Sequence, residues 1–189
     1  MTKRAFAAGL LGGVAMFLWA SLAHLVLPIS HAGWSEIPNE QPVLAALQTT
    51  LGQNTGLYLY PALGTAPDAM QQYDAKLAVN PSGILIYHPP GAKSLEPRQI
   101  VTELFTEILE SLLAVFLLAQ TGVKTFAGRT GFVTLAGFLA SITTNLSYWN
   151  WYGFPAVYTV AYMTIQVVGF AAAGAAIAVL MKNRALRYS

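Results

Sequence analysis

The stretch TELFTEILESLLAVFLLA, residues 102–119, decides the predicted fold. It is apolar over about the length that a transmembrane helix needs, yet it contains Glu103, Glu107 and Glu110. Steps of four and three residues place these carboxylates on one side of a helix, which we call the glutamate face. An acidic side chain at the centre of a span costs about 2.5–3.5 kcal/mol, so three of them need partners, water or bound protons. The glutamate face therefore marks the candidate site.

The composition of the chain indicates an integral membrane protein. Hydrophobic residues make up 55% of the 189 residues, charged residues only 10%, and the mean hydropathy is +0.51. Four apolar segments have about the 20 residues needed to cross the hydrocarbon core of a bilayer. They cover residues 5–27, 100–121, 130–147 and 155–181. We therefore expect an all-α membrane protein built as a four-transmembrane-helix bundle.

Lysine and arginine predict the orientation of these segments, because short cytoplasmic loops are enriched in both residues. They precede the first segment, lie between the second and third, and follow the fourth. The residues are Lys3, Arg4, Lys124, Arg129, Lys182, Arg184 and Arg187. All fall on one side of a four-span arrangement, without any acidic residue among them. Both termini are therefore predicted to be cytoplasmic, and the membrane is expected to be a bacterial inner membrane.

The connection between the first two segments, residues 28–99, is long enough to form a small structured cap in the periplasm. GLYLYP from Gly56 and GILIYHP from Gly83 are typical of strands closed by proline. EQPVLAALQTTL, with Asn39 as its N-cap, and PDAMQQYDAKLA from Pro67 are predicted to be helices. The strands could pair in parallel or antiparallel. We expect a small α/β extracytoplasmic domain in the first loop.

Polar side chains in the other spans lie at the same predicted depth as the glutamate face. Helical periodicity aligns Tyr162 with Gln166, while Asn145 and His24 lie near the outer ends of their spans. Polar groups in lipid turn toward protein or water, so these side chains are expected to surround one outward-facing cavity. The candidate ligand- or cation-binding residues are Glu103, Glu107, Glu110, His24, Asn145, Tyr162 and Gln166.

The glutamate face has three possible roles. The acids can be neutral groups hydrogen-bonded to Thr, Tyr and Gln on neighbouring helices, they can bind protons or a cation, or they can be catalytic. His24, Glu103 and Glu107 also match a ligand set of one imidazole and two carboxylates, which suits a divalent metal. We expect no haem and no iron–sulfur cluster, because paired in-span histidines and all cysteines are missing.

The aromatic connection SYWNWYGFP, residues 147–155, lies at the outer end of the last two spans. Rings at this depth are typical of the aromatic belt at a membrane interface. They can also shape the mouth of a ligand site.

The first apolar segment has a second interpretation as a cleavable signal peptide, because Lys3 and Arg4 precede it and SHA precedes Gly33. Its apolar run exceeds the roughly 7–15 residues of the hydrophobic region of a signal peptide, which favours a retained anchor. Gly9 and Gly13 form a small-xxx-small pair, which predicts close packing against a neighbouring helix.

The sequence leaves two classes of function. The chain has no nucleophile elbow, phosphate-binding glycine loop or zinc-protease motif, which favours an integral membrane binding or accessory subunit. Its outward-facing pocket would bind an amphipathic ligand, a cation or a partner helix. The alternative is a metal-dependent or acid–base membrane enzyme that acts on a lipid-like substrate at the outer leaflet.

Membrane lipid is an expected partner, and a second membrane protein or another copy of the chain is a further candidate. Nucleic acid is not an expected partner, because no cluster of lysine and arginine in the sequence is dense enough to bind it.

Overall fold

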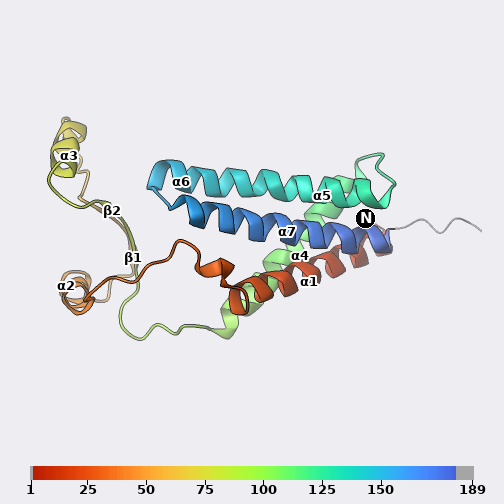
Figure 1. The fold of residues 1–189 in the computed structure, drawn as a ribbon, viewed down its shortest axis with the longest axis horizontal. Coiled ribbons are helices and arrows are strands. Elements are labelled where there is room, and N and C mark those ends of the chain that lie inside the picture. The colour runs from red at the N-terminus through yellow and green to blue at the C-terminus, as the bar shows by residue number, and fades with distance from the viewer. Residues whose placement is uncertain (1, 182–189) are drawn as a thin grey trace, which may run out of the picture. The chain divides into compact units, whose positions relative to one another are not determined.

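The computed structural model describes residues 2–181, which are mostly helical and include one small two-stranded sheet (Figure 1). The predicted cytoplasmic residues Lys182, Arg184 and Arg187 lie outside this range. The chain divides into a helical unit, residues 1–34 and 95–189, and a smaller unit, residues 35–94. Each unit is described by itself.

The helical unit consists of long helices near the predicted apolar segments and of short helical elements that follow some of them. These are α1 (Lys3–Leu25), the short 3-10 helix η1 (Pro28–His31), α4 (Pro97–Ala119), α5 (Phe126–Ser141), the π-helical turn η2 (Ile142–Leu146), α6 (Ser147–Tyr152) and α7 (Ala156–Leu180). Local capping explains where several of them begin. Thr2 accepts a hydrogen bond from the Ala5 amide, and Glu96 forms a capping box with Gln99 at the start of α4.

Close packing in the helical unit depends on small residues in α1. Helix α1 lies between α4 and α7, and α5 packs along α7 (Figure 1). A Cβ atom added at Gly9 would lie 2.5 Å from Leu112, and one added at Gly13 would lie 2.4 Å from Ile108 Cα. The predicted close approach of the glycine pair is therefore made to α4.

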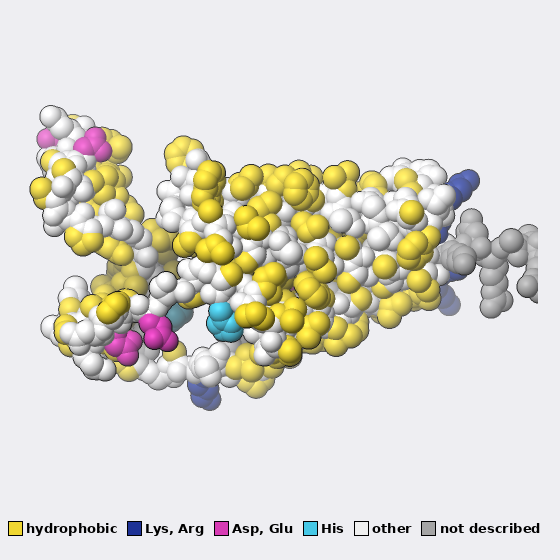
Figure 2. Space-filling model, in the orientation of Figure 1, with side chains coloured by type: hydrophobic (Ala, Val, Ile, Leu, Met, Phe, Trp, Pro, Cys, Tyr) yellow, Lys and Arg dark blue, Asp and Glu magenta, His cyan; other side chains and the backbone are white. Residues whose placement is uncertain are grey.

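A buried arginine, Arg129, forms hydrogen bonds with two other segments at one end of the helical unit. Arg129 is only 6% exposed, and its Nε donates to Val123 O at 3.3 Å while Nη1 donates to Met181 O. Arg4 donates to Leu180 O. A cation at the C-terminus of a helix is favourable because the last carbonyl groups carry partial negative charge. Lysine and arginine side chains gather at this end of the helical unit, which we call the basic end (Figure 2).

Two helices in the described range, α1 and α7, are long and apolar enough to cross a membrane by length and composition. The predicted four-span bundle is therefore not confirmed. Helix α4 has sufficient length but contains four charged residues, namely Arg98, Glu103, Glu107 and Glu110. Helix α5 has only 16 residues before the π-helical turn η2 interrupts its regular hydrogen bonding.

The smaller unit contains α2 (Gln41–Leu51), β1 (Gly56–Tyr60), α3 (Ala69–Leu77) and β2 (Gly83–Tyr87). The strands pair antiparallel, with Tyr58 opposite Leu85, which decides the direction that the sequence left open. The hydroxyl of buried Tyr87 donates to Gly52 O at 2.9 Å, linking the sheet to the end of α2. The prediction of Asn39 as an N-cap was wrong. Its φ of 51° places it in a turn, and Glu40 precedes the helix.

Candidate binding cavity

A cavity of about 220 Å³ lies among α1, α4 and α7, entirely within the helical unit. Its lining comprises Met16, Trp19, Ala20, His24, Glu103, Thr106, Glu107, Glu110, Tyr162, Ile165, Gln166, Gly169 and Phe170. Six predicted site residues are therefore brought together: the three glutamates, His24, Tyr162 and Gln166. They come from three helices that are far apart in the sequence.

The cavity occupies the half of the helical unit that is remote from the basic end. It is lined by the C-terminal part of α1 and by the N-terminal parts of α4 and α7. The half near the basic end is filled by apolar side chains, including Ala8, Val115, Leu118 and Ile177. Polar and apolar side chains thus occupy different halves of the helical unit.

The packing of α4 on α1 determines where the glutamate face points. Buried Ser111, Ala114 and Leu118 continue the side of α4 that lies against neighbouring helices. One turn before Ser111, Glu107 is half-buried, and its Oε2 is buried without a hydrogen-bond partner. A buried carboxylate oxygen that no protein group satisfies is available to a ligand.

Several polar hydrogens in the cavity wall are already used within the protein. Trp19 Nε1 donates to Ile165 O at 2.8 Å, and the Thr106 hydroxyl donates to Thr102 O at 2.9 Å. His24 Nδ1 lies 2.8 Å from Ala20 O, and because a carbonyl only accepts, Nδ1 holds the proton of this bond. The Nε2 atom of a neutral His24 is then a hydrogen-bond acceptor.

Asn145 lies behind the cavity wall and is not part of the lining. Its side chain is 6% exposed, and Nδ2 donates to Gln166 Oε1 at 2.7 Å and to Ser141 O at 3.0 Å. The π-helical turn η2 contains Asn145, and such turns recur at functional sites. Asn145 therefore positions Gln166, which does line the cavity.

Trp19 and Phe170, which were not among the predicted site residues, supply aromatic walls. A signal for Trp19 was present, because residues 16, 20 and 24 recur at helical spacing and Trp19 adjoins that row. Phe170 gives no such signal, since an aromatic residue in an apolar helix usually serves packing. Phe170 also packs closely on α5, because a Cβ atom added at Gly137 would lie 2.3 Å from Phe170 Cγ.

A row of aromatic rings leads from the connection between α6 and α7 to the cavity. Centroid distances are 5.3 Å for Tyr148 and Phe154, 5.2 Å for Phe154 and Tyr158, and 4.1 Å for Tyr158 and Tyr162. Tyr162 then meets His24 edge to face at 6.0 Å. These contacts fix the ring of Tyr162 in the cavity wall.

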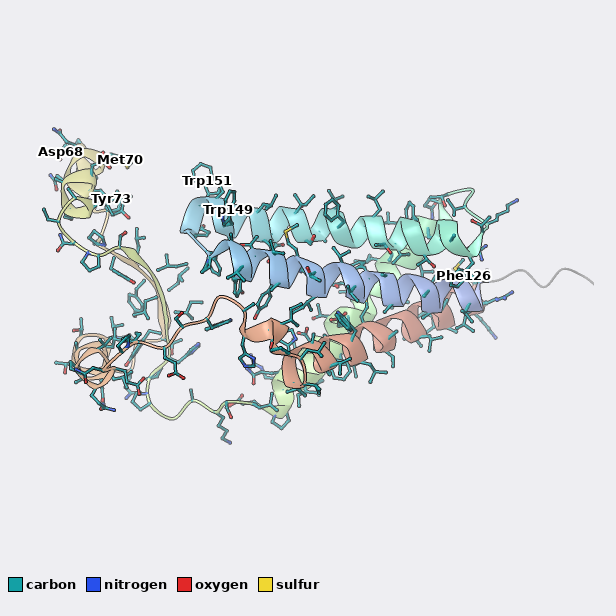
Figure 3. The ribbon with its side chains drawn as sticks, in the orientation of Figure 1. Asp68, Met70, Tyr73, Phe126, Trp149 and Trp151 are labelled. Atoms are coloured by element: carbon teal, nitrogen blue, oxygen red, sulfur yellow. The ribbon has the colours of Figure 1, made fainter. Side chains whose placement is uncertain are left out.

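The two tryptophans of the same connection behave differently. Trp149 and Trp151 are exposed, Trp151 by 76%, and Trp151 projects outward from α6 (Figure 3). An exposed indole at the end of an apolar helix suits a membrane interface. The connection thus contributes both to the aromatic row and to an exposed aromatic surface.

The predicted metal set is not assembled by the described residues. No group of three His, Cys, Asp or Glu side chains within residues 2–181 is placed to hold a metal ion. His24, Glu103 and Glu107 share a cavity without converging on one point. The hydrogen bond from Nδ1 to Ala20 O and the contact with Tyr162 hold the imidazole in its own position.

No protein-family profile, curated protein sequence or solved structure matches the chain.

Proposed function

We propose that the protein is an integral membrane binding or accessory subunit, and that its cavity takes an amphipathic ligand. One observation carries this proposal: three carboxylates, an imidazole, a phenol and an amide from three helices surround a single cavity of about 220 Å³. Pockets with apolar walls and a few convergent polar groups are typical of small-molecule sites. Ionisable side chains within a membrane-spanning segment also indicate a functional site by default, because they are costly to keep there.

The surface of the helical unit supports a bundle that crosses the membrane with four helical segments. On α4 the side away from the cavity exposes Val101, Phe105, Leu109, Leu113 and Phe116. Hydrophobic side chains cover much of the visible surface of the helical unit (Figure 2). Exposed apolar surface of this extent is costly in water and favourable in lipid. Residues 126–152 form a continuous helical run through α5, η2 and α6, which is long enough for a third span.

The basic end supports the proposed orientation. Positive residues near span ends favour the cytoplasmic side. We therefore place Arg4, Lys124 and Arg129 at the cytoplasmic face of a bacterial inner membrane, and the smaller unit in the periplasm. The cavity then lies in the outer half of the bilayer, where lipids of the outer leaflet can reach it.

The orientation predicts separate labelling of two introduced cysteines. Gln53→Cys in the smaller unit should react with a membrane-impermeant maleimide in intact spheroplasts. Thr125→Cys, at the start of α5, should react only after lysis. The chain has no cysteine of its own, so each signal comes from one position. Equal labelling of both positions in intact spheroplasts would contradict the four-span arrangement.

Filling the cavity tests the binding function directly. An ideal Cβ atom at Gly169 would meet only Trp19 Cδ1, at 3.4 Å, so a larger side chain enters the cavity without a backbone clash. We expect wild-type protein, purified in a mild detergent, to retain one small molecule per chain, detected by mass spectrometry of a solvent extract. Gly169→Leu should lose most of this molecule, because the leucine occupies its space.

Gly131→Leu is the matched control. Gly131 is also a helical glycine, and a Cβ atom there has no neighbour within 4 Å. This variant should retain the molecule to the wild-type level. If Gly169→Leu and Gly131→Leu retain equal amounts, the cavity is not the binding site.

A further inference from the structure

We propose that the cavity binds an organic cation, an ammonium group attached to an apolar chain. This inference rests on the proposed binding function and names the chemistry of its ligand. It follows from the balance of hydrogen-bond donors and acceptors, from the aromatic walls and from the size and access of the cavity.

Acceptors dominate the polar part of the lining. Glu103, Glu107 and Glu110 contribute three carboxyl groups, and Oε2 of Glu107 is buried without a partner. The hydrogens of Trp19 Nε1, the Thr106 hydroxyl and His24 Nδ1 are already donated to backbone carbonyls. The side-chain donors that remain in the lining are the Gln166 amide and the Tyr162 hydroxyl, which are fewer than the carboxyl oxygens. None of the described residues that line the cavity is Lys or Arg, so no internal cation neutralises the acids there. A ligand with positive charge complements such a wall.

The aromatic walls favour the same kind of ligand. The indole N–H of Trp19 is held by Ile165 O, and Tyr162 is stacked on Tyr158 with centroids 4.1 Å apart. Both rings line the cavity in fixed positions, together with Phe170. Aromatic faces attract ammonium groups, most strongly where water is excluded, and cages of this type recognise quaternary ammonium ligands.

Size and access limit the bound part to a head group. The cavity, at about 220 Å³, is smaller than the roughly 300–1,000 Å³ of pockets that enclose a whole drug-sized ligand. Helix α4 packs mainly on α1 and makes little contact with α7, and Glu103 and Thr106 at the cavity wall are exposed. An apolar chain attached to the head group can therefore leave between α4 and α7 into the lipid.

The test compares a cation with a neutral molecule of the same chain length. Trp34, Trp149 and Trp151 are changed to Phe, so that the fluorescence of the purified protein in neutral detergent reports on Trp19 alone. Decyltrimethylammonium should cause a saturable change, and decanol should bind at least about tenfold more weakly, because it lacks the charge that the acids and rings attract.

Charge-neutral variants then assign the selectivity to the cavity. Glu107→Gln combined with Glu110→Gln should weaken decyltrimethylammonium binding by about tenfold and change decanol binding much less, so that the preference for the cation is lost. Glu36→Gln, in the smaller unit, is the control and should bind both probes as the wild type does. If the double variant does not fold, Tyr162→Leu replaces it. That variant keeps every carboxylate and removes one ring, and it should weaken the binding of decyltrimethylammonium more than the binding of decanol.

The outcomes separate this inference from the proposed function. Equal affinity for decanol and decyltrimethylammonium, both lost in Gly169→Leu, would overturn the cation preference and leave an amphipath-binding cavity. Failure of both probes to bind would overturn both proposals. Where decyltrimethylammonium does bind, competition with lipids in bicelles identifies the natural source of the ammonium group. Displacement of the probe by phosphatidylcholine but not by phosphatidylglycerol assigns the site to a lipid head group. Displacement by neither lipid assigns the site to a free amphipathic amine.

Discussion

Gly13→Val is expected to separate α1 from α4 and to lower the free energy of unfolding by more than about 3 kcal/mol. A Cβ atom at this position would lie 2.4 Å from Ile108 Cα and 2.8 Å from Ile108 N. Both atoms belong to the backbone of α4, so no side-chain rotation can relieve the clash. The helix itself must move, and the glutamate face moves with it. Thermal unfolding in detergent, followed by intrinsic fluorescence, measures the loss.

Gly131→Val is the control for this effect. It introduces the same β-branched side chain into a helix, at a glycine whose added Cβ meets no atom within 4 Å. Helix propensity therefore changes equally in both variants, and only the contact with α4 differs. If the two variants unfold at the same temperature, α1 and α4 do not approach each other as closely as the structure shows.

Arg129→Met is expected to give the second largest loss, about 1–3 kcal/mol. The buried guanidinium donates to Val123 O and Met181 O, and methionine can satisfy neither carbonyl. Carbonyl groups left without donors inside a protein cost more than exposed ones, because water cannot replace the lost bond. Equilibrium unfolding in a mixed detergent system would measure the difference from wild type.

Lys124→Met provides the comparison for Arg129→Met. Lys124 is exposed at the same basic end, so its replacement removes the same charge without removing a buried donor. We expect this variant to stay within about 0.5 kcal/mol of the wild type. An equal loss in the two variants would attribute the stability to net charge at the basic end and not to the hydrogen bonds of Arg129.

Helical periodicity was sufficient to predict which side chains of α1, α4 and α7 meet. The spacing of Glu103, Glu107 and Glu110 and the alignment of Tyr162 with Gln166 depend only on 3.6 residues per turn, and the structure keeps that geometry in these helices. Both strands of the smaller unit were likewise visible as short runs rich in Leu, Ile and Tyr. Their antiparallel pairing depends on the path of the intervening chain, which local pattern does not encode.

The remaining errors arise where local geometry departs from the regular helix. The π-helical turn η2 rotates Asn145 relative to an α-helical register, so the residue lies behind Gln166 and not in the cavity. The predicted metal set is not assembled among residues 2–181 for a different reason. Residue types at a common depth predict proximity, but the rotamer of His24 is decided by its bond to Ala20 O and by Tyr162. Neither contact can be read from spacing alone.

Cysteine accessibility along α4 tests most directly the claim that the glutamate face borders an outward-open cavity. Single cysteines replace Glu103, Glu107, Phe105 and Leu109 in the cysteine-free chain, and a membrane-impermeant maleimide is added to spheroplasts. Labelling should be strong for Glu103→Cys and Glu107→Cys, which line the cavity, and weak for Phe105→Cys and Leu109→Cys, which face away from it. Equal labelling at all four positions, or stronger labelling at Phe105→Cys and Leu109→Cys, would contradict the cavity.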